Sequence, residues 1–372
     1  MAEEGVRLMS EAQPIRPRAE QRYATELSML AANDHFPRPG GWRLSPRAVR
    51  RFLLGDPKSG ISRKFYGDDP LVDRAVVSLM SQQGLMLVGE PGTAKSLLSE
   101  LLSAAICGTS ALVVQGSAGT TEDHIRYGWN YALLLAEGPS ERALVPSPVL
   151  NAMRSGRVVR FEEITRCPPE VQDALISILS EKALALPELG PDAVASAVPG
   201  FNVIATANLR DRGVHEMSSA LKRRFNFETV HPIADPEFER ELVLRQLAER
   251  LGPAGVTVSG ERDVAEVLVR IFQDLRTGRT AEGASLNRPD AVMSTAEAVN
   301  VLHAAALEAV YLDDGKLSAA HVARQIQGVV LKDSPEDSKR LRAYVDHIVK
   351  ERAGRSVVWK DFYQAARSLK FG

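Results

Sequence analysis

The most specific chemical pattern in the sequence is a glycine-rich octapeptide, Gly89-Glu90-Pro91-Gly92-Thr93-Ala94-Lys95-Ser96. It follows an apolar run at 85–88 and precedes a helical pattern that continues to residue 107. A buried strand, this turn and a helix form a phosphate-binding loop, in which backbone N–H groups and the helix dipole face a triphosphate. We expect Lys95 to contact the β- and γ-phosphates and the Ser96 hydroxyl to bind a magnesium ion.

Ala94 departs from the usual pattern, in which glycine precedes the lysine. A methyl group is compatible with the loop if Ala94 keeps ordinary helical or extended backbone angles, and we therefore expect the loop to form. Taken alone, the octapeptide has a second interpretation as an incidental glycine-rich turn.

Two adjacent carboxylates, Glu162 and Glu163, follow the apolar run at 158–161. Chemistry at a triphosphate uses one acidic group near the metal and one that polarises the attacking water. Successive side chains of a strand point in different directions, so we assign Glu162 to the magnesium shell and Glu163 to the water. Aspartate is usual at the first position, and the longer Glu162 is expected to act on the metal more indirectly. A solvated acidic strand end is the alternative.

Two further polar features come later in the chain. Asn208 ends the apolar run at 201–207, and a basic cluster at 222–224 precedes the last expected strand at 225–230. Asn208 is placed to position the water, although an asparagine at a strand end is also an ordinary turn residue. Arginine is suited to stabilising charge on a transferring phosphoryl group, whereas a solvated basic face is the simpler interpretation of the cluster.

Alternating strand and helix patterns predict an α/β fold with a mostly parallel sheet. The five expected strands are 85–88, 111–115, 158–161, 201–207 and 225–230, and a long helix is expected over 168–184. Beyond residue 236 the periodicity is helical, over 237–250, 262–275, 289–311, 319–331 and 338–351, with an amphipathic tail from 357 to 371 that we expect to pack on these helices. We therefore expect three parts: an N-terminal extension at 1–60, flexible at first and then packed on the next domain, a nucleotide-binding domain at 61–235, and an α-helical lid domain at 236–372.

Composition restricts the class of partner. The 372 residues include 46 Lys and Arg against 47 Asp and Glu, a formal net charge of -1 that provides no general attraction for nucleic acid or anionic membranes. The start of the sequence lacks a secretory pattern, and no apolar run approaches the roughly 18 residues of a membrane span. The two cysteines, Cys107 and Cys167, have neither disulfide nor zinc spacing and are expected to be reduced thiols of a cytoplasmic protein.

Together these segments resemble the AAA+ ATPases, and within them the MoxR family, over most of the chain from Tyr66 past Leu302. The run Phe161-Glu162-Glu163-Ile164-Thr165-Arg166, followed by Pro168-Pro169, is similar to that family's acidic motif and the start of its next helix. Alanine before the loop lysine is also familiar in that family. The segment 221–225 is similar to its Asp-Arg-Phe motif, with Arg224 at the arginine position and Arg223 where aspartate is usual.

The resemblance implies a sheet of order 5-1-4-3-2 and a bound ATP with Mg²⁺, contacted by the loop from Gly89 to Leu97. It implies that Asn208 is the first sensor and that Arg288, in Gly283-Ala284-Ser285-Leu286-Asn287-Arg288, is the second sensor of the lid. Arg224, with Arg223 beside it, is implied to act on the neighbouring subunit's nucleotide. The active species is then a homo-oligomeric ring, usually a hexamer, that remodels or helps to assemble a protein complex with a von Willebrand factor A domain partner.

Other interpretations remain open. The segment 116–157 contains Tyr127-Gly128-Trp129 and is expected to form either a hairpin with its own small aromatic core or a pore element that grips a polypeptide. Glu162 in place of aspartate leaves room for a nucleotide-gated scaffold with little turnover. A chelatase-type subunit has a similar ATPase core. A nucleic-acid motor is disfavoured by the neutral charge and the absence of a recognisable nucleic-acid-binding module.

Overall fold

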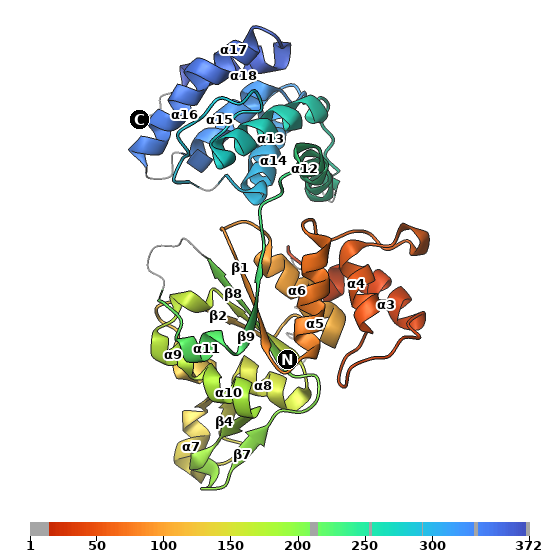
Figure 1. Cartoon of the computed structure of the whole chain (residues 1–372), viewed down its shortest axis with the longest axis vertical. Coiled ribbons are helices and arrows are strands. Elements are labelled where there is room, and N and C mark those ends of the chain that lie inside the picture. The colour runs from red at the N-terminus through yellow and green to blue at the C-terminus, as the bar shows by residue number, and fades with distance from the viewer. Residues whose placement is uncertain (1–14, 209–214, 253–254, 292, 331–333, 370–372) are drawn as a thin grey trace, which may run out of the picture. The chain divides into compact units, whose positions relative to one another are not determined.

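The computed structural model describes residues 15–208, 215–252, 255–291, 293–330 and 334–369. Residues 1–14, which begin the expected extension, and 370–372, which end the expected tail, lie outside the described part. The chain divides into two units (Figure 1): Met1–Gly89 with Ala94–Val230, and Glu90–Thr93 with His231–Gly372. The break after Val230 comes slightly before the expected boundary at residue 235.

The first unit is built on a five-stranded sheet in which each pair of neighbouring strands is parallel. The strands lie in the order β2 (Val113–Gln115), β5 (Val158–Glu162), β8 (Asn202–Asn208), β1 (Gly84–Gly89) and β9 (Phe225–Thr229). Numbered along the chain from one to five, and taken from the β9 edge, this order is 5-1-4-3-2. The expected fold class and strand order are therefore confirmed.

Helices cover both faces of the sheet, because alternate residues of its strands point to opposite sides. Leu85 and Leu87 of β1 pack on one side against α4 (Pro46–Leu54), α5 (Asp69–Met80) and α6 (Lys95–Cys107). Met86 and Val88 pack on the other side against α8 (Pro148–Ser155), α9 (Pro169–Asp173) and α10 (Leu175–Glu181). The phosphate loop follows the carboxyl end of β1, and the acidic pair lies at the carboxyl end of β5, another central strand of the same sheet.

The described part of the N-terminal region belongs to the same core. Helices α2 (Ala19–Arg22) and α3 (Ala24–Ala32) precede α4, and Leu27, Trp42 and Phe52 are buried with residues of α5, α6 and β1. From residue 15 onward this segment is thus an integral layer of the first unit rather than an appendage.

Two segments of the first unit contain more structure than the sequence patterns indicated. The expected helix at 168–184 is divided into α9 and α10 and ends at Glu181; Lys182 then adopts a left-handed conformation (φ 52°), and β6 (Ala183–Ala185) pairs antiparallel with β7 (Val194–Ser196). In the segment 116–157, β3 (Tyr127–Trp129) pairs with β4 (Leu144–Pro146) around α7 (Tyr131–Glu137). The strand pair of the expected hairpin is therefore present, and the ring centroids of Tyr127 and Trp129 lie 5.9 Å apart in an edge-to-face contact. Tyr127 is buried in the core on one face of the main sheet, so the expectation of a separate small core was wrong.

The second unit is helical and has its own core. Its helix α14 starts at Thr295 rather than at 289, because Ser294 accepts from the N–H of Glu297 in a capping box. Phe362 of the C-terminal helix is fully buried in this core, so the tail packs as expected. The helices of this unit are α12 (Pro236–Leu251), α13 (Glu261–Thr277), α14 (Thr295–Leu312), α15 (Ala319–Val330), α16 (Pro335–Tyr344), the π-helical turn η6 (Val345–Val349), α17 (Lys350–Ala353) and α18 (Val357–Ser368).

The first unit also contains the short elements η1 (Pro57–Ser59), η2 (Glu122–His124), η3 (Ile164–Arg166), η4 (Pro187–Leu189) and α11 (Ser219–Lys222). None of the helices in the described ranges is both long and apolar enough to cross a membrane.

Candidate functional site

The phosphate loop connects the end of β1 to the start of α6. Gly92 (φ 76°) and Ala94 (φ 67°) have left-handed backbone angles, a conformation that curls successive N–H groups toward a common centre. Ala94 is the N-cap of α6 and supplies no side-chain hydrogen bond to the first turn of the helix. The Lys95 side chain is buried and its Nζ donates to Gly89 O over 3.1 Å. A turn of this shape, a helix N-terminus and a lysine are the donor set that a polyphosphate requires, so the residues present fit that group.

Ala94 does not have the ordinary backbone angles that its methyl group was expected to require. The left-handed conformation costs a residue with a Cβ atom about 1–2 kcal/mol, and such strain is concentrated at functional sites. The loop forms nevertheless, because β1 and α6 are anchored in the core on both sides. The expectation of ordinary angles was therefore wrong, whereas the expected turn between strand and helix is present.

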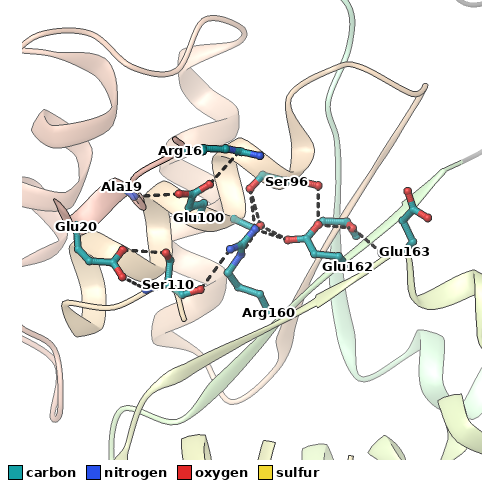
Figure 2. Close-up of polar contacts among 11 residues, drawn as sticks. Arg16, Ala19, Glu20, Ser96, Glu100, Ser110, Arg160, Glu162 and Glu163 are labelled. Carbon is teal, nitrogen blue, oxygen red and sulfur yellow. Dashed lines mark hydrogen bonds and ion pairs between the residues drawn. The ribbon is translucent and has the colours of Figure 1, made fainter. Parts of the chain in front are cut away.

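The Glu162 carboxylate, at the end of β5, accepts hydrogen bonds from four side chains. Ser96 Oγ and Thr206 Oγ1 donate to its Oε2 over 2.6 and 2.9 Å. Ser99 Oγ and Arg160 Nη2 donate to its Oε1 over 2.6 and 2.8 Å (Figure 2). Burial raises the pKa of Glu162, but the Arg160 charge and the three hydroxyls outweigh burial and hold it below its usual value. Glu162 is therefore a buried anion.

Ser96 and Glu162 are joined in a manner that suits a metal ligand. A hydroxyl has one proton to donate and lone pairs to offer. Because Ser96 donates its proton to Glu162, its lone pairs remain available to a cation. The four donors leave the carboxylate little capacity for a further ligand of its own. That Glu162 acts on a metal indirectly stays a prediction. Within the described ranges, no group of three or more His, Cys, Asp or Glu side chains could hold a metal ion.

Glu163 differs from its neighbour in direction and in exposure. Its backbone is left-handed (φ 55°), and its N–H donates to Thr206 Oγ1 over 2.9 Å. Its side chain is 36% exposed, and its carboxylate forms an ion pair with Arg166 Nε at 2.8 Å. Figure 2 shows this carboxylate directed away from the Glu162 cluster. The adjacent glutamates thus occupy two environments, one buried and one open to solvent.

The sheet places Asn208 beside the phosphate loop. In the pairing of β1 with β8, Asn208 lies opposite Gly89, the residue at which the loop begins. Gly116, at the end of β2, also approaches closely: its N–H donates to Glu162 O over 2.7 Å, and a Cβ atom on it would lie 2.3 Å from Glu163 O. A glycine at this position is what allows β2 to end against the acidic pair.

Arg223 and Arg224 lie at the opposite end of the sheet. Gly84, the first residue of β1, donates its N–H to Arg224 O over 3.0 Å, whereas the phosphate loop follows Gly89 at the other end of the strand. Five residue steps at about 3.3 Å each separate the two ends by about 17 Å. The Arg224 side chain donates to Ser180 Oγ and Ala220 O, and Arg223 is exposed. The fold therefore separates this arginine pair from the loop of its own chain.

Arg288 belongs to the second unit, where it is exposed on the connection between α13 and α14. Its side chain covers Gly278, at which a Cβ atom would lie 2.5 Å from Arg288 Cγ. Its role as second sensor stays a prediction.

Three contributors to the site, Ser99, Arg160 and Thr206, were not identified from the sequence. The sequence contains a feature that could have identified each of them. Ser99 follows Ser96 by three residues on one helix and so shares its face. Thr206 precedes Asn208 by two residues on one strand, and Arg160 is a charge within an otherwise apolar buried run.

Comparisons with known proteins agree with this geometry. Residues 84–225 match the family described as AAA domain (dynein-related subfamily), and residues 237–370 match the YehL-like AAA+ ATPase C-terminal domain. The chain is 50% identical over 355 residues to YehL of Escherichia coli (strain K12), covering 95% of this chain and 97% of that protein. It is 29% identical over 211 residues to SH1500 of Staphylococcus haemolyticus (strain JCSC1435), covering 56% of this chain and 74% of that protein.

Among solved structures, NtrX from Brucella abortus is similar with a TM-score of 0.44 and 12% identity, over 68% of this chain and 52% of that one. A similarity this low says nothing about function. The relationship rests instead on the two family models and on the near full-length similarity to YehL. On that basis, the chain belongs to the YehL-like AAA+ ATPases.

Proposed function

We propose that this protein binds ATP with Mg²⁺ and hydrolyses it to ADP and phosphate. The observation that carries the proposal is the 2.6 Å hydrogen bond from Ser96, directly after the loop lysine, to the buried Glu162 carboxylate. It joins a phosphate-binding turn to an anionic strand end, the two parts that a nucleoside-triphosphate site needs.

The first group of residues binds and orients the nucleotide. The loop from Gly89 to Leu97 surrounds the phosphates with backbone N–H groups, and Lys95 contacts the β- and γ-phosphates. Ser96 is the protein ligand of the magnesium ion, and Glu162 holds the Ser96 hydroxyl in place. When bound, the ion would neutralise negative charge on the phosphates. Family membership supports adenine as the base.

The second group of residues acts on the water. Glu163 is the exposed carboxylate of the pair and accepts hydrogen bonds from the water that attacks the γ-phosphorus. Asn208 lies beside the start of the loop and positions the same water from the neighbouring strand. As the new P–O bond forms, the water loses a proton, which Glu163 accepts. The bond between the γ-phosphorus and the β–γ bridging oxygen breaks, and ADP leaves with that oxygen.

The position of the arginine pair supports a site shared between subunits. Because about 17 Å of β1 separates Arg224 from its own loop, Arg224 stabilises the transferring phosphoryl group of a neighbouring chain. Arg223 extends the same basic edge. We assign residues 236–372 the role of a helical lid, in which Arg288 acts as the second sensor. The assembly is then a homo-oligomeric ring, most simply a hexamer.

The similarity to the MoxR type leads to a proposal about the client. The ring uses hydrolysis in the cytoplasm to remodel or help assemble a protein complex, with a von Willebrand factor A domain protein as partner. Chelatase-type and nucleic-acid motors use a similar core, and ATPase stimulation by DNA that falls with salt would favour the latter.

Two variants test the core of the proposal. Lys95→Ala should abolish nucleotide binding, whereas Glu163→Gln should bind ATP normally and lose turnover. Glu170→Gln is the matched control, because Glu170 is an exposed glutamate on α9 of the same unit. Steady-state ATP hydrolysis and fluorescent-nucleotide binding should be measured for all three variants. Normal turnover in Glu163→Gln would contradict the assignment.

A second candidate function follows from the ion pair between Glu163 and Arg166. A carboxylate held by arginine is not free to polarise water, which favours a nucleotide-gated scaffold with little turnover. The two functions differ in a single measurement. ATP binding and turnover should be measured for wild type and Arg166→Ala. If both proteins bind ATP tightly and both hydrolyse less than about one ATP per minute, the scaffold is the better description.

A further inference from the structure

Arg160 is a charged residue in the middle of the buried strand β5. Its backbone pairs with Val113 of β2 and Ile204 of β8, so it lies in the interior of the sheet. It shares a strand face with Glu162, two residues later. Its side chain is only 11% exposed. A nearly buried guanidinium at this depth requires partners, and its partners define its role.

The guanidinium donates to four acceptors from different parts of the unit. Nη2 donates to Glu162 Oε1 over 2.8 Å and to Ser96 O over 3.1 Å. Nε donates to Ser99 Oγ over 3.0 Å, and Nη1 donates to Ser110 O over 3.3 Å (Figure 2). Two of these acceptors, Ser96 and Ser99, themselves donate to Glu162. Arg160 therefore holds both the carboxylate and the helix turn that bears its hydroxyl donors.

The arrangement divides the two oxygens of Glu162 between two tasks. Arg160 and Ser99 occupy Oε1, which leaves Oε2 to the hydroxyls of Ser96 and Thr206. A glutamate is one methylene longer than an aspartate and has one more torsion angle to restrain. The planar fork of an arginine, unlike the point charge of a lysine, can restrain it from several directions.

We propose that Arg160 is a positioning residue for the magnesium–nucleotide site. It fixes the Glu162 carboxylate, and thereby the direction in which the Ser96 hydroxyl offers its lone pairs to the metal. The inference rests on the proposed function, and it explains how a glutamate serves where an aspartate is usual.

The support for Arg160 continues to the N-terminal helix α2. Ser110, whose carbonyl accepts from Arg160, donates its backbone N–H and its hydroxyl to Glu20 over 3.1 and 2.8 Å. The N–H of Ala19 donates to Glu100 of α6 over 2.9 Å (Figure 2). Glu20 thus holds the segment that contains Ser110, which accepts from one edge of the guanidinium. Substitution of Glu20 should therefore disturb the position of Arg160 less than substitution of Arg160 itself.

The test measures metal affinity as well as activity. Mn²⁺ binding to the protein with saturating ADP should be followed by electron paramagnetic resonance for wild type, Arg160→Met, Arg160→Lys and Glu20→Gln. Removal of residues that orient metal ligands typically weakens metal affinity or activity by about 10- to 100-fold, and we expect this for Arg160→Met. Arg160→Lys should be intermediate, because lysine keeps the charge but cannot reach all four acceptors. Glu20→Gln should lose less than Arg160→Lys.

Activity supplies the second readout. We expect kcat of Arg160→Met to fall together with Mn²⁺ affinity, while affinity for ADP without metal stays within about twofold. Combining Arg160→Met with Glu162→Asp should recover part of the loss, because the shorter side chain needs less restraint. Arg154→Met is the matched control, since it removes an arginine paired with Glu141 on the surface of α8.

The outcomes separate the inference from the proposed function. Unchanged Mn²⁺ affinity in a folded Arg160→Met overturns the positioning role. If Arg160→Met does not fold, the Mn²⁺ affinity of Arg160→Lys decides instead. An affinity equal to that of wild type overturns the positioning role. A wild-type protein that binds Mn²⁺ with ADP but hydrolyses no ATP contradicts the proposed function, while the Mn²⁺ titrations still decide the role of Arg160.

Discussion

The hydroxyl of Thr206 donates to Glu162 Oε2 over 2.9 Å and accepts from the backbone N–H of Glu163 over the same distance. One side chain on β8 thereby holds both members of the acidic pair on β5. It lets the buried Glu162 and the exposed Glu163 point in different directions from consecutive positions. The different environments of the two glutamates depend on this threonine.

Replacement of Thr206 by valine should impair both stability and turnover. The change keeps the shape but leaves the Glu163 N–H without its acceptor and Glu162 Oε2 with one donor fewer. An unsatisfied buried group costs about 1–3 kcal/mol, and we expect the free energy of unfolding in urea to fall by that amount. Thr206→Ser keeps the hydroxyl and should retain most of the ATPase activity. Equal turnover in Thr206→Val and wild type would refute the bridging role.

Ala94→Gly should stabilise the protein. Glycine adopts the left-handed conformation of residue 94 without the Cβ penalty, and after the entropy of glycine in the unfolded chain is deducted, we expect a gain of up to about 1 kcal/mol. Ala105→Gly in the interior of α6 is the control and should have the opposite sign, because glycine costs about 1 kcal/mol in a helix. Urea denaturation of the two variants checks the prediction, and a loss of stability in Ala94→Gly would contradict it.

The stability contributed by Glu162 should depend on pH. The groups that face its carboxylate are Arg160 from its own strand, Ser96 and Ser99 from α6, and Thr206 from β8. Because these groups hold its pKa below the ordinary value of 4.5, the folded state binds its proton less readily than the unfolded state. The stabilisation is therefore complete above the unfolded pKa and is lost as the pH falls through the folded one.

This pH dependence can be isolated with Glu162→Gln, which cannot titrate at that position. The difference in unfolding free energy between wild type and Glu162→Gln should be largest at neutral pH and should shrink in acid. Urea denaturation from pH 7 downward measures it. A difference that is constant with pH would show that the carboxyl has the same pKa in the folded and unfolded states, and would contradict the prediction.

Arg224→Ala should abolish hydrolysis without preventing nucleotide binding, because in the proposed ring the side chain serves a neighbouring chain. An arginine that stabilises a transferring phosphoryl group is worth about 10³- to 10⁵-fold in kcat. Mixing Arg224→Ala with Glu163→Gln should restore part of the activity, since some junctions then combine an intact arginine with an intact glutamate. The control Lys222→Ala, an exposed neighbour paired with Glu216, should stay active. Two inactive parents that stay inactive when mixed and co-assembled would argue against a shared site.

The sequence alone was sufficient for the architecture and for the parts of the site that are local in the chain. The loop from Gly89 to Ser96 is recognisable because a strand, a glycine-rich turn and a helix are adjacent in sequence. The helical second unit could be predicted from apolar periodicity, whereas the sheet order followed only from the family resemblance. Element ends were less certain: α14 starts at Thr295, where a capping box decides, rather than at 289.

Only the tertiary structure decided which distant residues meet, because hydrogen bonds between strands and helices depend on register and not on spacing. The cluster of Ser99, Arg160 and Thr206 around Glu162 brings together α6, β5 and β8, and no local pattern announces it. The left-handed angle of Ala94 was likewise invisible, since propensity disfavours it and only anchoring on both sides of the loop sustains it. The sequence thus determined which chemical groups are present, and the packing of the parallel sheet determined how Glu162 and Glu163 came to differ.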